Sequence, residues 1–144
     1  MIVVDTTVLV YSVGTDHALR TPCRDLLRLV EEGRVRATTT VEVLQEFAHV
    51  RSRRRSRADA AAVARSAAIG LSPLVHPEFD DLMEGLELFE TSKRLGAFDA
   101  VLAASARRQG WALASADVAF EAVQGLRYLN PASPTFLDET REAG

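Results

Sequence analysis

The sequence of 144 residues has one cysteine, Cys23, one lysine, Lys93, and no apolar run that approaches the length of a membrane span. A single cysteine excludes an internal disulfide and is typical of proteins from a reducing compartment. Charged residues interrupt every apolar segment, so we expect no membrane-spanning helix. The start of the chain lacks the basic lead of a secretory signal, because Asp5 arrives almost at once. These absences predict a cytoplasmic protein that does not associate with a membrane.

Acidic residues slightly outnumber basic ones, and the densest group of basic residues lies in one segment. The chain has 17 basic and 20 acidic residues, a formal net charge of −3, which does not indicate a general nucleic-acid-binding surface. Five of the arginines, however, lie in the segment RSRRRSR at 51–57. Any contact with a polyanion is therefore expected to depend on this local cluster.

Hydrophobic periodicity predicts a chain in which strands alternate with helices. Short β-rich or apolar runs are expected to form strands at 2–4, 35–40, 111–115 and 126–130. Helical spacing of apolar residues, with capping residues and terminating glycines, predicts helices within 6–13, 17–33, 40–54, 56–70, 78–96, 97–110 and 117–123.

This alternation predicts an α/β fold, an α/β/α sandwich around a central, mainly parallel sheet. The length fits one domain, which we place at residues 1–131, because no linker or repeat divides the chain. Residues 132–144 are expected to form a loosely docked C-terminal tail.

Four acidic residues lie inside otherwise apolar segments: Asp5, Glu46, Asp99 and Asp117. Asp5 ends the first strand and Asp117 directly follows the third, so parallel strands place both at the sheet edge where ligands of open α/β sheets bind. Asp99 lies near the first turn of a helix. An unpaired carboxylate in an apolar setting is costly, so we expect the four to converge on one cleft.

Converging carboxylates repel one another and need a cation. Oxygen ligands without a matching Cys/His set favour Mg²⁺, with Mn²⁺ as the alternative. Such an ion lowers the pKa of bound water and stabilises charge on a phosphodiester. Each acid also has a simpler interpretation, as a helix cap for Asp5, Asp99 and Asp117 and as a solvated helix residue for Glu46.

The segments around these acids resemble the PIN-domain ribonucleases, and especially the VapC toxins of bacterial toxin–antitoxin pairs. The resemblance extends over nearly the whole chain through the fragments VVDTT, VEVLQEF, FDAVLAA and SADVAF. Each fragment is weak alone, but their order and spacing agree with the family. The resemblance implies a Mg²⁺-dependent endoribonuclease that inhibits translation by cleaving tRNA or ribosomal RNA, with a cognate VapB-like antitoxin, a homodimer and a toxin–antitoxin hetero-oligomer.

The resemblance also implies which residues form the site. Asp5 and Asp99 are expected closest to the metal, with Glu46 and Asp117 acting directly or through water. Many relatives carry another acid soon after the last aspartate, where this chain has Val118 and Ala119, so the number of metal ions stays open.

Two hydroxyl residues and three arginines complete the predicted site. Thr6 and Ser115 match family hydroxyls that bond a carboxylate or ligand, or cap a helix. Arg51, Arg54 and Arg55 follow the helix that carries Glu46, and arginine suits phosphate recognition because its planar fork is always charged. The alternatives for the cluster are a solvated surface and a docking site for an acidic antitoxin segment.

Three other functions are compatible with clustered acidic residues, and the sequence bears on each of them. A PIN nuclease could process RNA without being a toxin, or act on DNA flaps, although the short chain leaves little room for a DNA-gripping region. A receiver-like signalling domain also gathers aspartates around Mg²⁺, but it needs a lysine after a late strand, and Lys93 precedes a helix instead. A catalytically inactive PIN fold is disfavoured by the presence of all four acids.

Overall fold

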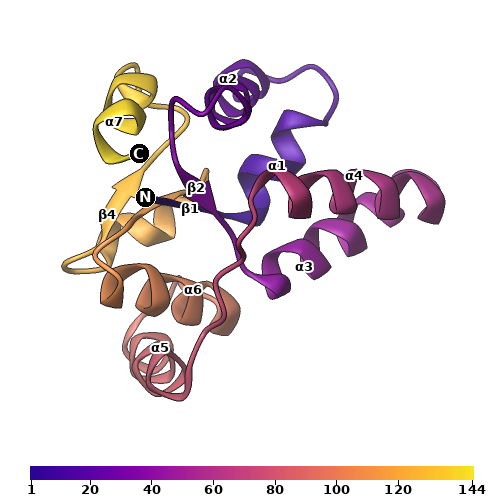
Figure 1. Cartoon of the computed structure of the whole chain (residues 1–144). Coiled ribbons are helices and arrows are strands. Elements are labelled where there is room, and N and C mark those ends of the chain that lie inside the picture. Colours follow the sequence, from indigo (N-terminus) through magenta and orange to yellow (C-terminus); the bar gives the residue numbers. More distant parts are fainter.

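The computed structural model describes residues 1–144 and has a central parallel sheet between layers of helices (Figure 1). The four strands run in the order β2-β1-β3-β4, and every neighbouring pair is parallel. The strands are β1 (Ile2–Val4), β2 (Ala37–Thr38), β3 (Ala112–Ala114) and β4 (Arg127–Leu129). In Figure 1, α2 and α7 lie on one side of the sheet and α5 and α6 on the other. The expected α/β/α fold is confirmed.

The helices alternate with the strands along the chain. They are α1 (Thr6–Ser12), α2 (Arg20–Glu31), α3 (Val41–Ser52), α4 (Arg57–Gly70), α5 (Phe79–Thr91), α6 (Ala97–Arg108), the short 3-10 helix η1 (Val118–Ala122) and α7 (Phe136–Ala143). Several of them start at a side-chain cap: at the start of α3, for example, the Thr40 hydroxyl accepts a hydrogen bond from the Val43 amide. None of the helices combines the length and apolar composition needed to cross a membrane.

The register of the sheet brings two loops together. β1 pairs with β3 through Ile2 opposite Ala112 and Val4 opposite Ala114, so both strands end at the same level. The Asp5 amide continues this pairing by donating to the Ala114 carbonyl at 3.0 Å. The residues that directly follow the two central strands therefore lie side by side at one edge of the sheet.

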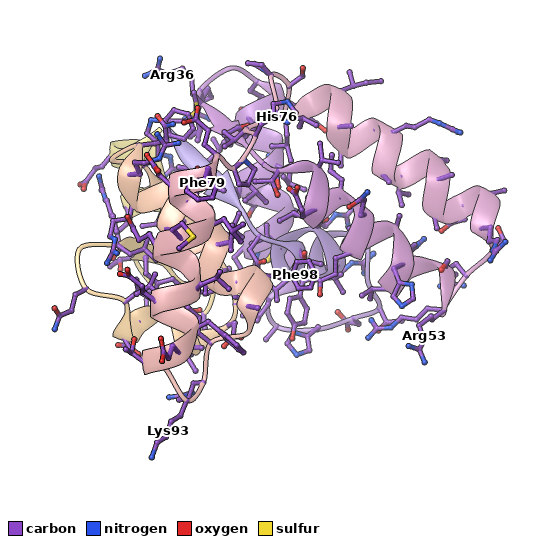
Figure 2. The ribbon with its side chains drawn as sticks, turned by 90° about the horizontal axis from the view of Figure 1, so that it is seen from below. Arg36, Arg53, His76, Phe79, Lys93 and Phe98 are labelled. Carbon is purple, nitrogen blue, oxygen red and sulfur yellow. The ribbon has the colours of Figure 1, made fainter.

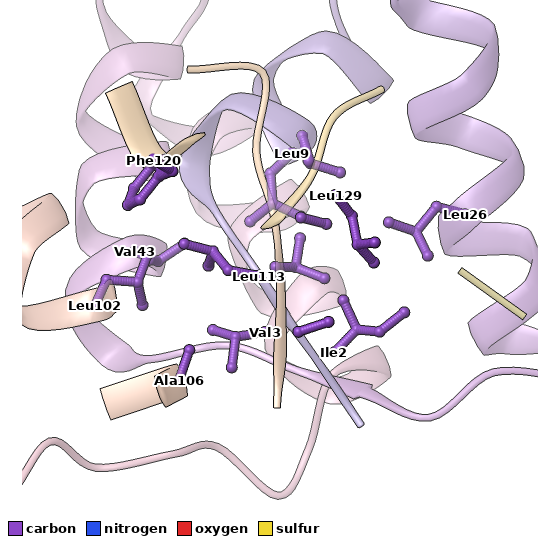
Figure 3. Close-up of a cluster of buried hydrophobic side chains, with 14 of the residues drawn as sticks. Ile2, Val3, Leu9, Leu26, Val43, Leu102, Ala106, Leu113, Phe120 and Leu129 are labelled. Atoms are coloured by element: carbon purple, nitrogen blue, oxygen red, sulfur yellow. The ribbon is translucent and has the colours of Figure 1, made fainter. Parts of the chain in front are cut away.

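The core consists of one cluster of 26 buried apolar residues on both faces of the sheet (Figure 3). β1 is buried along its whole length, as expected for a strand covered by helices on both faces. Phe47 from α3, Phe120 from η1 and Phe136 from α7 are its largest side chains, each at most 2% exposed. This packing fixes the frame from which the loops at the sheet edge project.

The C-terminal residues differ from the sequence prediction. Residues 132–144 were expected to form a loosely docked tail, but residues 136–143 form α7, which packs on α2. Phe136 and Thr140 are buried, and the N-terminal ammonium of Met1 donates a hydrogen bond to the Ala143 carbonyl. An eight-residue helix carries too short an apolar repeat to be recognised, and it is stable here because of tertiary packing.

Helices α5 and α6 are joined by an ion pair whose carboxylate is buried and whose arginine is one-third exposed. Asp81, in the first turn of α5, is fully buried and accepts two hydrogen bonds from the Arg108 guanidinium, at 2.5 and 2.9 Å. Its carboxylate also accepts from the Glu78 amide at 2.8 Å. These hydrogen bonds, above all those from Arg108, hold the pKa of Asp81 below its ordinary value despite its burial.

Candidate active site

The four predicted acids line one open cavity of about 460 Å³ at the carboxyl edge of the sheet. Each comes from a different segment: Asp5 follows β1, Glu46 lies on α3, Asp99 on the first turn of α6, and Asp117 follows β3. The crossovers of the parallel sheet bring together residues that are up to 112 positions apart in the sequence. The structure therefore brings the four predicted acids together in a single cavity.

Asp5 is held firmly, with only 3% of its surface exposed. Its Oδ2 atom accepts hydrogen bonds from the Thr7 amide at 3.2 Å, the Thr7 hydroxyl at 2.7 Å and the Ser115 hydroxyl at 2.7 Å. Its Oδ1 atom receives no hydrogen bond from the protein. Asp5 thus caps α1 with one oxygen and leaves the other available to a ligand.

Asp117, the acid that follows β3, likewise caps a helix and lines the cavity. Asp117 caps η1, because its Oδ1 atom accepts from the Ala119 amide at 2.8 Å. The Asp117 amide in turn donates to the Ser115 hydroxyl at 3.0 Å. Asp5 and Asp117 are therefore both helix caps and residues of the cavity wall, so the two interpretations do not exclude each other.

The hydroxyl groups of the site act on the carboxylates. Thr6 donates to Oε2 of Glu46 at 2.7 Å, which joins α1 to α3, and Ser115 donates to Asp5. Thr7 was not among the predicted site residues, yet its hydroxyl donates to Asp5 and accepts from the Ala116 amide at 2.9 Å. The second threonine of VVDTT was the signal that could have revealed it. These hydroxyls therefore position the carboxylates, and a substrate contact by Thr6 or Ser115 stays a prediction.

The pKa of Asp99 reflects the crowding of the four carboxylates. Burial, and then repulsion by the other three carboxylates, raises its pKa to about 6. A backbone hydrogen bond from Gly96 opposes this shift only in part. The cavity thus concentrates negative charge that a cation would relieve.

We expect Asp99→Asn to stabilise the metal-free protein at high pH. The folded state binds the Asp99 proton more tightly than the unfolded chain does, so ionisation of Asp99 lowers stability as the pH rises from about 4 to above 6. In EDTA, the variant's free energy of unfolding should exceed that of the wild type by about 1–3 kcal/mol at pH 8. At pH 4 the difference should vanish. Urea unfolding at both pH values measures it, and a variant less stable than the wild type at pH 8 would contradict the repulsion.

The donor set of this cavity fits a hard divalent cation. All the candidate ligands are oxygens, and one oxygen of Asp5 has no protein donor. No three acidic, histidine or cysteine side chains are placed to hold a metal ion by themselves. A divalent ion that completed its coordination with waters would need only one or two of these carboxylates. That all four acids take part in binding the ion stays a prediction.

The three predicted arginines are placed differently. Arg51 is already paired: its guanidinium binds Asp59 at 2.5 and 3.1 Å and donates to the Val13 carbonyl at 3.0 Å. Arg54 lines the same cavity as the four carboxylates, whereas Arg55 lines only a neighbouring depression. We therefore remove Arg51 from the proposed substrate contacts, because it ties the end of α1 to α3 and α4.

An apolar cleft of about 430 Å³ adjoins the acidic cavity and shares Asp5, Glu46 and Asp99 with it. Its wall includes Phe79 of α5 and Phe98 of α6, which are 73% and 77% exposed. Figure 2 labels both side chains, on α5 and on the first turn of α6. The sequence had indicated only that these two segments are helical, so this exposed apolar surface was not predicted.

Comparison with known proteins places these features in a family. The family model "PIN domain" matches residues 2–126. The chain is 50% identical to Ribonuclease VapC7 of Mycobacterium tuberculosis over 133 residues, which cover 91% of this chain and 92% of that protein. It is 36% identical to Ribonuclease VapC23 of the same organism over 112 residues, or 76% of this chain and 86% of that protein.

Proposed function

Because the chain belongs to the PIN domain family and is an endoribonuclease of the VapC type, we propose that it is a Mg²⁺-dependent toxin that inhibits translation by cleaving tRNA or ribosomal RNA. PIN nucleases generally use divalent metal ions. The observation that carries the proposal is the convergence of four carboxylates from distant segments on one cavity, with a raised pKa at Asp99. We propose that the protein acts in the cytoplasm.

The mechanism assigns a task to each side chain of the cavity. Asp5 and Asp99 would hold the ion, with Glu46 and Asp117 binding it directly or through water. When bound, a divalent ion supplies an activated water and stabilises the charge that develops on a phosphodiester. Thr7 and Ser115 hold one oxygen of Asp5, so that the other stays directed to the ligand, and Thr6 keeps Glu46 in place.

VapC toxins pair with VapB antitoxins, and we propose the same kind of partner for this chain. An antitoxin arginine placed among the carboxylates would neutralise them through charge-assisted hydrogen bonds and exclude the metal ion. We also propose a homodimer and a toxin–antitoxin hetero-oligomer. The exposed apolar side chains of α5 support a protein interface, since such a patch is unusual on a monomer.

Cleavage of cellular RNA tests the proposed function. We expect the purified protein to produce new 5′ ends at a few positions of tRNA or ribosomal RNA in Mg²⁺ or Mn²⁺, and none in EDTA. Sequencing of 5′ ends after incubation with total RNA identifies the cleaved molecule and bond. Cleavage that continues in EDTA would contradict the metal mechanism, and cleavage confined to precursor ends would favour an RNA-processing enzyme over a toxin.

A further inference from the structure

Three side chains outside the carboxylate cluster line the same cavity as the four acids. Tyr11 lies on α1, His17 lies in the loop between α1 and α2, and Arg54 lies in the turn after α3. None of the hydrogen bonds that order the carboxylates involves them. They combine two aromatic rings and a cation, the groups that bind single-stranded nucleic acids.

The two rings form a stacked pair. Their centroids are 4.6 Å apart and their planes are inclined by 28°. Nδ1 of His17 accepts a hydrogen bond from the Leu19 amide at 3.1 Å, which fixes the orientation of the imidazole. Tyr11 is half-buried and covers one face of the ring, while His17 itself is exposed. The stack is thus an anchored aromatic platform at the rim of an acidic cavity.

Arg54 is the cation of this rim that has no partner. It is exposed and forms neither an ion pair nor a side-chain hydrogen bond, in contrast to Arg51, which is tied to Asp59. A free guanidinium beside four carboxylates offers local attraction to a phosphate that the acids would otherwise repel. Arg54 lines the cavity, whereas its neighbour Arg53 lines neither the cavity nor the adjoining depression.

We propose that Arg54, His17 and Tyr11 form a nucleotide subsite next to the cleavage position. Arg54 binds a phosphate of the RNA backbone, and the exposed face of the His17–Tyr11 stack takes an unpaired base. The inference rests on the proposed cleavage of RNA. The base at this subsite must be unpaired, because a base inside a duplex cannot stack on a protein side chain.

Binding of a short single-stranded RNA that carries 2-aminopurine tests the subsite. With wild-type protein in EDTA, which prevents cleavage, we expect quenching of the probe as its base stacks. His17→Ala should abolish the quenching and weaken binding about fivefold or more. His17→Phe should retain both, since it keeps an aromatic face. The control His49→Ala removes an exposed histidine outside the cavity and should change neither.

The arginine is tested by the salt dependence of the same binding. Arg54→Ala should make the slope of log K against log salt shallower by about 0.7, the loss of one phosphate contact on a single strand. The control is Arg53→Ala, whose side chain points away from the body of the protein in Figure 2 and should leave the slope unchanged.

The outcomes separate this inference from the proposed function. If wild-type protein cuts RNA, but His17→Ala and Arg54→Ala behave like their controls, the subsite alone is overturned. If a fully paired duplex of the same sequence binds as tightly as the single strand, stacking of a base on the His17–Tyr11 pair is overturned. If the wild type neither cuts nor binds RNA, both the function and the subsite fail.

Discussion

Asp5→Asn and Asp99→Asn are each expected to lower the rate of RNA cleavage by at least about a hundredfold. Loss of a group that merely supports a metal ligand typically costs 10–100-fold in affinity or activity, so loss of a ligand should cost about that much or more. Asparagine keeps the shape of the side chain but removes the charge that holds a divalent cation. Initial rates on a fluorogenic RNA substrate, at saturating Mg²⁺, measure the effect.

The control for this prediction is Glu42→Gln. Glu42 lies on α3 one turn before Glu46 and is exposed, but it is not among the charges that raise the pKa of Asp99. Removing its charge should change the rate by less than about threefold. Circular dichroism should show that all three variants are folded. If Asp5→Asn and Asp99→Asn cleave RNA as well as Glu42→Gln does, the carboxylates are not the catalytic site.

Arg108→Ala is expected to lower the free energy of unfolding by about 2–3 kcal/mol, because it leaves the buried carboxylate of Asp81 without its cation, although the Arg108 side chain itself is one-third exposed. Asp81 is completely buried between α5 and α6, and Arg108 supplies the two side-chain hydrogen bonds that compensate its charge. The Glu78 amide, which also donates to Asp81, cannot replace them. Urea unfolding at neutral pH measures the loss.

Arg107→Ala is the matched comparison, one residue earlier on the same helix. Arg107 pairs with Glu84 of α5 at 2.7 Å, but both side chains are about one-third exposed, and Arg107 also donates to the Gln124 carbonyl. Solvent screens such a pair, so its removal should cost about 1 kcal/mol, with the lost backbone contact included. Equal losses for the two variants would mean that burial of Asp81 does not set the cost.

The helices, the strands and their parallel arrangement could be predicted from the sequence, because the local capping residues agree with the alternation of strands and helices along the chain. Caps such as Thr40 and the positive-φ Gly110 after α6 mark helix ends that tertiary packing does not change. The acids could be placed together because carboxyl ends of neighbouring parallel strands share an edge. The positions of Asp5 and Asp117 could be predicted directly from that rule. Those of Glu46 and Asp99 could be predicted because their helices lie next to the same edge.

Other features could not be predicted because they depend on which side chains meet across the fold. The pairing of Arg51 with Asp59 depends on the angle at which α3 turns into α4, which no spacing rule supplies. The hydrogen bond from Thr6 to Glu46 likewise joins residues 40 positions apart. Helix α7 depends on burial of Phe136 against the core, since its own sequence is too short to mark a helix.

The central claim is that Asp5, Glu46, Asp99 and Asp117 form one divalent-ion site, and anomalous diffraction from crystals soaked in MnCl₂ at pH 7.5 tests it most directly. We expect a manganese peak inside the cavity that these carboxylates line, within coordination distance of Asp5 and Asp99. The same soak of Asp99→Asn crystals should give no peak or a much weaker one. Manganese bound elsewhere on the protein, with the cavity holding none, would contradict the account.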